Sequence, residues 1–142
     1  MPTSLIRVSA ERAEQLKLLA AARRSTVASL IDDLVAQAIQ AGDFPDATPG
    51  FDLEREPATG EVTISLDGLT LEPMAPRFAL DLADQLEKGD RTMNVIGRNT
   101  VEIGRVGAGV EIKATHGKGK ARRVFTPSVA RDLARQLRKA VA

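Results

Sequence analysis

The sequence contains no cysteine, tryptophan or tyrosine, and its only aromatic residues are four phenylalanines. Without cysteine the chain has no disulfide framework, no thiolate metal site and no cysteine nucleophile. The scarcity of aromatics requires aliphatic cores, and it removes the stacking surfaces that many proteins use to bind single-stranded nucleic acid. No run approaches the ~18 apolar residues of a membrane span. The first residues also lack the pattern of a secretory signal. We therefore expect a cytoplasmic protein that does not enter a membrane.

The formal net charge of +1 conceals a strong asymmetry along the chain. Residues 1–42 carry five Lys or Arg and four Asp or Glu, a net charge of +1. Residues 43–90 carry three basic and twelve acidic residues, whereas residues 91–142 carry twelve basic and three acidic ones. This distribution indicates that the two later segments pack against each other or that the basic segment binds a polyanion.

The amino-terminal part of the chain reads as a strand followed by two amphipathic helices. Alternating residues over 3–9 predict a short strand, and apolar residues recur at helical spacing over 10–23 and 27–41. Ser9 and Thr26 are suitable N-cap residues for these helices. The glycine that follows the second helix is a typical stop signal. Such a small β-α-α unit cannot bury a core alone and requires a partner subunit.

Residues 43–50 contain two prolines and a glycine without periodicity, which predicts a linker. Beyond this linker the chain contains an internal repeat. The eleven residues that begin at Pro76 recur from Pro127 at a constant offset of 51, with seven identities. Proline is favoured at the first position of a helix, so each copy predicts a helix start.

Strand patterns and turn residues precede both predicted helices. The predicted strands are 51–55, 61–66 and 69–72 before the first helix, and 100–105, 109–114 and 121–125 before the second. We therefore expect residues 51–142 to form two tandem βββα repeats, 51–90 and 99–142, which share one core. The expected fold class is α+β, with a β-α-α arm over residues 1–42 followed by this repeated βββα-βββα domain.

The arm carries a resemblance to a known family. Leu5-Ile-Arg-Val-Ser9, a helix, Arg24-Ser-Thr-Val-Ala-Ser-Leu-Ile31 and a second helix together resemble the ribbon–helix–helix family (Arc, MetJ and CopG-like DNA-binding proteins) over residues 3–42. In that family two subunits pair their amino-terminal strands into an antiparallel ribbon that enters the major groove. The resemblance implies an obligate homodimer that binds double-stranded DNA as a transcriptional regulator, typically a repressor.

The resemblance also implies which residues meet DNA. They are Thr3, Leu5 and Arg7 in the strand and Arg24, Thr26 and Val27 at the start of the second helix. Arg7 can form a bidentate contact with guanine, and Leu5 can contact a thymine methyl group. Free backbone N–H groups near Thr26 can hold a phosphate. Arg24 stands where the family often has glycine, so we expect a left-handed backbone there at a mild energetic cost.

Two further groups of charged residues call for an interpretation. Asp81, Asp84 and Glu87 lie on the exposed side of the first repeat helix, and Arg131, Arg135 and Arg138 occupy nearly equivalent places on the second. Their complementary faces can meet within one subunit, between subunits, or stay separated by solvent. Lys118, Lys120, Arg122 and Arg123 form a basic hairpin, which either protects a sheet edge from pairing or makes secondary contacts with phosphates.

The sequence contains no pattern that indicates catalysis, a metal or a cofactor. His116 is the only histidine, and we expect a solvated loop residue rather than a metal ligand. The favoured hypothesis is therefore a DNA-binding repressor that is not an enzyme, a homodimer that can associate into a dimer of dimers. The alternative is an antitoxin or a conjugation or partition accessory protein whose carboxy-terminal domain binds a protein partner. A third hypothesis makes the repeat domain a sensor of a small ligand.

Overall fold

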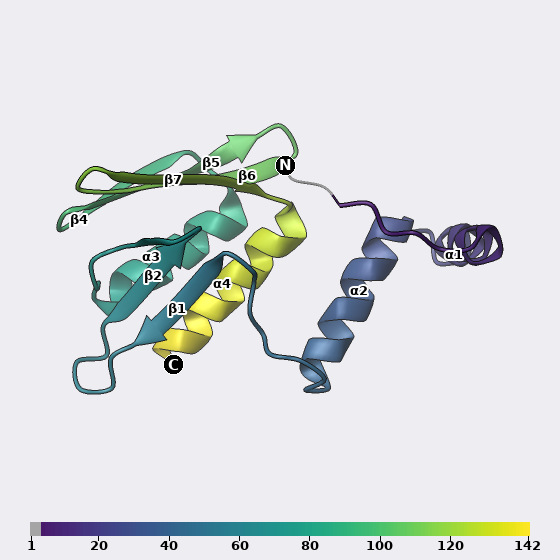
Figure 1. The fold of residues 1–142 in the computed structure, drawn as a ribbon, viewed down its shortest axis with the longest axis horizontal. Helices are drawn as coiled ribbons and strands as arrows, with labels where there is room; N and C mark the ends of the chain where they lie inside the picture. The colour runs from purple at the N-terminus through teal and green to yellow at the C-terminus, as the bar shows by residue number, and fades with distance from the viewer. Residues whose placement is uncertain (1–3) are drawn as a thin grey trace. The chain divides into compact units, whose positions relative to one another are not determined.

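A computed structural model describes residues 4–142, and the chain divides into two compact units on either side of the bond between Asp46 and Ala47. This boundary lies inside the segment 43–50. Figure 1 shows helices α1 and α2 in the amino-terminal unit and all strands in the carboxy-terminal unit. Over the described residues, no helix combines the length and the apolar character that crossing a membrane requires.

The amino-terminal unit consists of α1 (Ala10–Ala22) and α2 (Val27–Gln40), in agreement with the two predicted helices. The side chains of Ser9 and Thr26 each accept a hydrogen bond from the backbone N–H three residues further on, at 3.2 and 3.1 Å. Both predicted N-caps are therefore confirmed. Each cap satisfies one of the backbone donors that the start of a helix leaves unpaired.

The turn between α1 and α2 is closed by Arg24, whose φ of 51° is left-handed as expected. The N–H of Arg24 donates to the carbonyl of Ala21 at 3.1 Å, and the N–H of Ser25 donates to that of Ala20 at 2.8 Å. This pair of bonds forms a Schellman motif, in which glycine usually occupies the left-handed position. Arg24 therefore adopts a conformation that is mildly costly for a residue with a side chain.

The strand predicted over residues 3–9 is not formed in the single chain. Thr3 lies outside the described residues, and residues 4–9 belong to neither sheet. The prediction was wrong for the isolated subunit because an extended segment becomes a strand only when a neighbouring strand satisfies its backbone groups. Within the described chain, no segment pairs with these residues.

The carboxy-terminal unit contains seven strands and two helices. In chain order they are β1 (Phe51–Arg55), β2 (Val62–Leu66), β3 (Leu69–Thr70), α3 (Pro76–Lys88), β4 (Thr92–Ile96), β5 (Asn99–Val106), β6 (Gly109–His116), β7 (Gly119–Phe125) and α4 (Pro127–Val141). The structure is thus α+β, as predicted. The strand β4 was not predicted, so the second run of strands contains four members instead of three.

The strands form two separate antiparallel sheets, with the orders β1-β2-β3 and β4-β5-β6-β7. Every connection between neighbouring strands within a sheet is a hairpin. The predicted Asp67-Gly68 turn is present, and both of its residues have positive φ values of 47° and 87°, as a type I′ turn requires. Gly97, with φ 61°, occupies the first central position of the β4–β5 turn, where a type II′ turn favours glycine.

Both sheets and both helices of this unit contribute to one apolar core of 21 buried residues. Alternate residues of β2 are buried, namely Val62, Ile64 and Leu66, so one face of the small sheet turns inward. Leu133 and Leu137 of α4 and Leu82 and Leu86 of α3 meet these side chains in the same cluster. Figure 1 shows α3 and α4 lying beneath the four-stranded sheet.

A buried asparagine connects the ends of the two sheets. Asn99, at the start of β5, is fully buried, and its side-chain amide pairs with the backbone of Glu72 through two hydrogen bonds of 2.9 Å. Glu72 lies just beyond the end of β3, and the side chain of Asn99 satisfies the backbone N–H and carbonyl that a neighbouring strand would otherwise pair with. Buried polar groups of this kind contribute to stability only when they are fully satisfied, as they are here.

Candidate nucleic-acid interface

The predicted base-reading residues are exposed where the structure describes them. Leu5 has 89% of its surface exposed, and Arg7 is also exposed. Ile6 and Val8, which the alternating pattern assigns to the opposite face of a strand, are exposed as well. Both faces of the predicted strand are therefore exposed to solvent in the single chain. One face carries Leu5 and Arg7, and the other carries the apolar pair Ile6 and Val8.

The start of α2 holds the predicted phosphate-contact residues. Thr26 uses its hydroxyl as the helix cap, Val27 is half-buried and Arg24 is exposed in the preceding turn. The cap satisfies the backbone N–H of Ser29, so the N–H groups of Val27 and Ala28 point out of the helix start without an intrahelical acceptor. With the positive end of the helix dipole, this arrangement suits an anion.

The two helices of the amino-terminal unit leave most of their apolar side chains in solvent. Only Ala20 and Leu30 are buried hydrophobic residues in the described part of this unit. Of the thirteen large hydrophobic residues that are exposed in the described chain, nine precede residue 47: Leu5, Ile6, Val8, Leu18, Leu19, Ile31, Leu34, Val35 and Phe44. A groove between α1 and α2 is lined by Leu16, Leu19, Leu30, Ile31 and Leu34. Such an apolar surface is characteristic of an interface with another chain.

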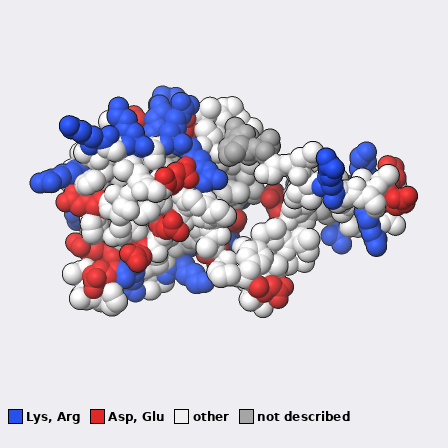
Figure 2. Space-filling view, viewed as in Figure 1, with Lys and Arg blue, Asp and Glu red and all other residues white. Residues whose placement is uncertain are grey.

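Basic side chains of the carboxy-terminal unit gather over the four-stranded sheet, at the top left of the view in Figure 2. Lys118 lies in the β6–β7 turn and Lys120 lies on β7, and both side chains are exposed. Among the described residues, neither lysine has an ion-pair partner. These two positions are the free cations of the predicted basic hairpin.

The two arginines of the same hairpin have structural partners instead. The guanidinium of Arg122 forms an ion pair with the carboxylate of Glu111 on β6, which Lys113 also approaches at 3.6 Å. Arg123 donates to the carbonyl of Pro49 at 2.9 Å and to the carboxylate of Asp67 at 3.1 Å. Arg123 thus holds the segment before β1 and the β2–β3 turn against β7.

The sequence did not reveal these two carboxylate partners. Glu111 was hidden because it lies among apolar residues of β6, and only the strand register brings it near Arg122 on the neighbouring strand. Asp67 lies 56 residues from Arg123. Alternation along the strands could have placed Glu111 and Arg122 on one face, but no local signal indicates the contact with Asp67.

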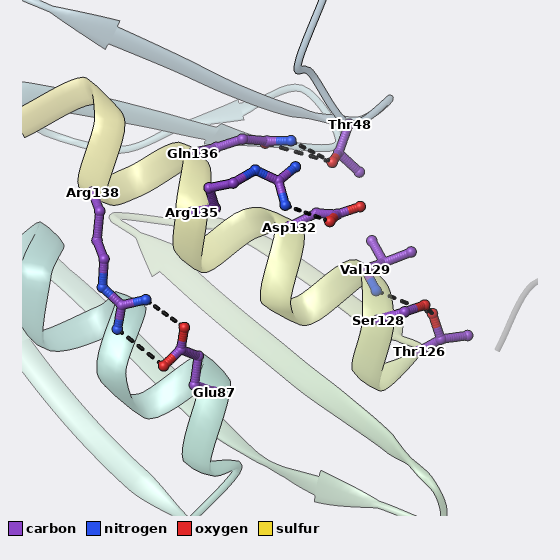
Figure 3. Close-up of polar contacts among 9 residues, drawn as sticks. All are labelled: Thr48, Glu87, Thr126, Ser128, Val129, Asp132, Arg135, Gln136 and Arg138. Atoms are coloured by element: carbon purple, nitrogen blue, oxygen red, sulfur yellow. Dashed lines mark hydrogen bonds and ion pairs between the residues drawn. The ribbon is translucent and has the colours of Figure 1, made fainter. Parts of the chain in front are cut away.

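The complementary charged faces of α3 and α4 meet within one subunit through a single arginine. Figure 3 shows the guanidinium of Arg138 against the carboxylate of Glu87, and the same guanidinium reaches Asp84 at 2.7 Å. The hydrogen bond from Arg138 lowers the pKa of Glu87, and the bonds to Glu87 and Asp84 raise the pKa of Arg138. Arg135 instead forms an ion pair with Asp132 on its own helix at 2.9 Å.

His116 is not a solvated loop residue, so that prediction was wrong. It is the last residue of β6, it is half-buried, and its Nδ1 lies 3.0 Å from Oδ1 of Asn99. Because this oxygen can only accept, the Nδ1 atom must donate, which fixes the tautomer of a neutral ring. The β6 strand extends two residues beyond its predicted end, and this extension carries His116 into the sheet.

The described residues contain no group of three His, Asp or Glu side chains that could hold a metal ion. The acidic residues of α3 therefore do not form such a group with any described neighbour. Comparisons with known protein families, with curated proteins and with solved structures return no match for this chain.

Proposed function

We propose that this protein is a dimeric, sequence-specific DNA-binding regulator of transcription, a repressor of the ribbon–helix–helix type. In this proposal residues 3–9 of two subunits pair into an antiparallel ribbon that enters the major groove. That groove, about 12 Å wide, accommodates a two-stranded ribbon. The obligate dimer is expected to act in the cytoplasm on double-stranded DNA, without a cofactor and without catalysis.

The observation that carries the proposal is the incomplete core of the amino-terminal unit. Its two helices are individually well capped and are joined by a tight turn, yet only Ala20 and Leu30 are buried hydrophobic residues among its described residues. A capped helix pair with exposed apolar faces gains its stability from a partner that covers those faces. A second copy supplies both the missing cover for the helices and the missing neighbour for residues 4–9.

Pairing of the strands also separates the two faces of residues 4–9. Ile6 and Val8 would turn toward the helices of the dimer, and Leu5 and Arg7 would turn toward the base edges, because successive strand residues point to opposite faces. A one-residue slip would reverse this arrangement and expose the apolar pair to the groove. Exposed Arg24 and the free N–H groups at the start of α2 would then contact the phosphates that flank the site.

We limit the secondary phosphate contacts of the carboxy-terminal unit to Lys118 and Lys120. Both side chains are exposed and unpaired among the described residues, whereas Arg122 and Arg123 hold carboxylates of their own unit. Such lysines would add affinity that does not depend on base sequence, since they interact only with the charge of the backbone.

We also infer that the carboxy-terminal unit is a duplication with an approximate internal twofold relation. Glu87 and Arg138 are equivalent positions at the offset of 51, and they contact each other directly. Equivalent residues of two copies meet in this way when they lie near a twofold axis. Gln85 and Gln136 are equivalent as well, and each bonds a segment that leads into the other half. Gln85 bonds Thr92, and Gln136 bonds Thr48, as Figure 3 shows.

The base-reading role of Arg7 is tested by Arg7→Ala in the full chain. Affinity for a specific site, found by footprinting the DNA upstream of the protein's own gene, should fall by about 1–3 kcal/mol if the arginine forms a bidentate base contact. Affinity for scrambled DNA should change much less. Arg12→Ala is the matched control, because Arg12 is an exposed arginine of the same unit whose side chain, among the described residues, bonds only Gln15. Equal losses on specific and scrambled DNA would contradict base reading by Arg7.

The secondary contacts are tested by replacing Lys118 and Lys120 with alanine together. The dependence of the logarithm of affinity on the logarithm of salt concentration should become shallower by about 0.9 for each phosphate that a lysine no longer neutralises. The discrimination between specific and scrambled DNA should stay the same. A variant with an unchanged salt dependence would remove these lysines from the interface while leaving the role of the arm intact.

A further inference from the structure

Strand β4 is a free edge of the four-stranded sheet and carries apolar side chains on its exposed face. It pairs with β5 on one side and is the terminal member of the order β4-β5-β6-β7. Met93 is 66% exposed and Val95 is 71% exposed. Exposed apolar edge strands recruit further strands, and folded proteins usually protect them with charges, proline or a bulge. The segment Thr92–Ile96 contains none of these three features.

The two exposed residues also direct their backbone groups away from the sheet. The β4–β5 hairpin has a two-residue loop, so Ile96 and Asn99 flank the turn as a hydrogen-bonded pair. Hydrogen-bonded and non-bonded pairs alternate along an antiparallel ladder. The backbone groups of Met93 and Val95 therefore face the free edge, where they offer two N–H donors and two carbonyl acceptors.

Side chains on the inner face hold this edge strand in place. Oε1 of Gln85 on α3 accepts from the hydroxyl of Thr92 and from the amide of Asn94, both at 2.7 Å. The Nε2 atom of Gln85 donates to Asn94 at 2.9 Å, and the amide of Asn94 also bonds the carbonyl of Val101 at 3.0 Å. A strand that is fixed before association loses less conformational freedom when a partner binds.

We propose that β4 pairs with β4 of a second copy of this chain in an antiparallel arrangement centred on Asn94. This register places Met93 of one copy opposite Val95 of the other, with both side chains on the exposed face. The same two residues supply four backbone hydrogen bonds across the junction. The two sheets then form one continuous eight-stranded sheet.

The charges beyond the strand ends favour a second copy as the occupant and an antiparallel direction. Extended by two residues at each end, the register brings Asp90 of one copy toward Arg98 of the other, and this occurs twice by symmetry. Both residues are exposed, and neither side chain has an ion-pair partner among the described residues. A parallel pairing would instead align like charges, which is unfavourable.

This association is independent of the DNA-binding proposal, because it uses a surface of the carboxy-terminal unit alone. Where the amino-terminal units also form a dimer, pairing through β4 provides the second contact of a dimer of dimers. Such a particle carries two DNA-binding ribbons. Failure of the β4 contact would leave the proposed ribbon unaffected, and the two proposals can therefore fail separately.

Disulfide trapping tests the register in the full chain, which has no cysteine of its own. Met93→Cys with Val95→Cys places two cysteines opposite two cysteines, at the ~5.5 Å Cα separation of a hydrogen-bonded pair, within the range that disulfides span. We expect a covalent dimer under mild oxidation that disappears on reduction. Thr100→Cys with Glu102→Cys is the matched control, since it has the same spacing and face one strand away from the edge. Cross-linking no greater than that of the control would overturn the proposal.

Charge reversal tests the direction of pairing without touching the strand. Asp90→Arg in the trapping variant should weaken association about tenfold, because two exposed ion pairs become two repulsive contacts. Adding Arg98→Asp restores the opposite charges and should recover the original yield of covalent dimer. An unchanged yield with Asp90→Arg, or no recovery in the combined variant, would contradict the antiparallel register.

Discussion

The two units of this chain differ in how much of their apolar surface they bury within one subunit. The carboxy-terminal unit assembles 21 buried apolar residues from two sheets and two helices of a single chain. The described part of the amino-terminal unit buries only Ala20 and Leu30 and leaves its remaining large apolar side chains at the surface or half-buried. One unit therefore completes its core within a subunit, and the described part of the other leaves most of its large apolar side chains in solvent.

A small unit can complete its core either with further elements of the same chain or with another subunit. A helix and a few strands bury too little surface to be stable alone. In the carboxy-terminal unit a second, similar run of strands and a helix lies in the same polypeptide and closes the core. In the amino-terminal unit, which has no second copy in the chain, the same requirement is met by a second subunit in the function that we propose. The stability of the carboxy-terminal unit should then be independent of protein concentration, whereas the stability of the amino-terminal unit should depend on it.

Removal of a core side chain should produce the largest effect. Leu133→Ala truncates a fully buried side chain of α4, and the free energy of unfolding of the carboxy-terminal unit should fall by about 2–5 kcal/mol. Urea unfolding followed by circular dichroism measures this loss at several protein concentrations. Leu80→Ala on α3 is the control, since Leu80 is 40% exposed and its truncation should cost less than that of the fully buried Leu133. If the loss of unfolding free energy in Leu133→Ala depended on protein concentration, the carboxy-terminal unit would not complete its core within one subunit.

Truncation of an exposed apolar residue of α2 should produce a smaller effect that appears only in the dimer. Leu34 is 66% exposed in the single chain, and burial of such a leucine is worth about 2 kcal/mol per subunit. Leu34→Ala should weaken self-association in sedimentation equilibrium and lower DNA affinity at low protein concentration. An association constant equal to that of the unmodified protein would show that a second copy does not cover this face of α2.

The smallest effect should come from the ion pair between α3 and α4. The hydrogen bond from Arg138 lowers the pKa of Glu87 in the folded state, so this carboxylate stabilises the fold at pH values above the pKa that it has in the unfolded chain. That contribution is lost as the pH falls through the lower pKa of the folded state. Glu87→Gln should therefore reduce the difference in unfolding midpoint between pH 7 and pH 3. The pair is exposed, so the change should be small and should shrink further in high salt. An identical pH dependence in both proteins would remove Glu87 from this role.

The helices and most strands could be predicted from the sequence because their signals are local. Ser9, Thr26 and the glycine after α2 mark helix ends through their own chemistry, and the Asp67-Gly68 turn follows from the backbone freedom of its residues. The strand β4 was missed because Met93 and Val95 face solvent while Asn94 faces the interior. This is the reverse of the pattern that marks a strand with one buried face.

The contacts of the candidate site could be predicted only in part. Exposure of Leu5, Arg7 and Lys118 follows from their positions in an arm and a turn. The partners of Arg123 and His116 could not be foreseen, since Asp67 and Asn99 approach them only after strands distant in the sequence have paired. In the dimer that we propose, the strand over residues 3–9 depends on a second chain, and its pairing therefore cannot be seen within one chain.

Hydrogen exchange of residues 5–8 tests whether two subunits complete the amino-terminal unit by pairing residues 3–9. Alternate backbone amides, those of Leu5 and Arg7 or those of Ile6 and Val8, should be protected at concentrations where the protein is a dimer, because only every second residue of a two-stranded ribbon donates to the partner strand. The protection should disappear on dilution. The Leu34→Ala variant should lose this protection at a higher concentration than the unmodified protein. If all four amides of residues 5–8 exchange in the dimer at the rate of an unstructured chain, these residues do not pair between subunits.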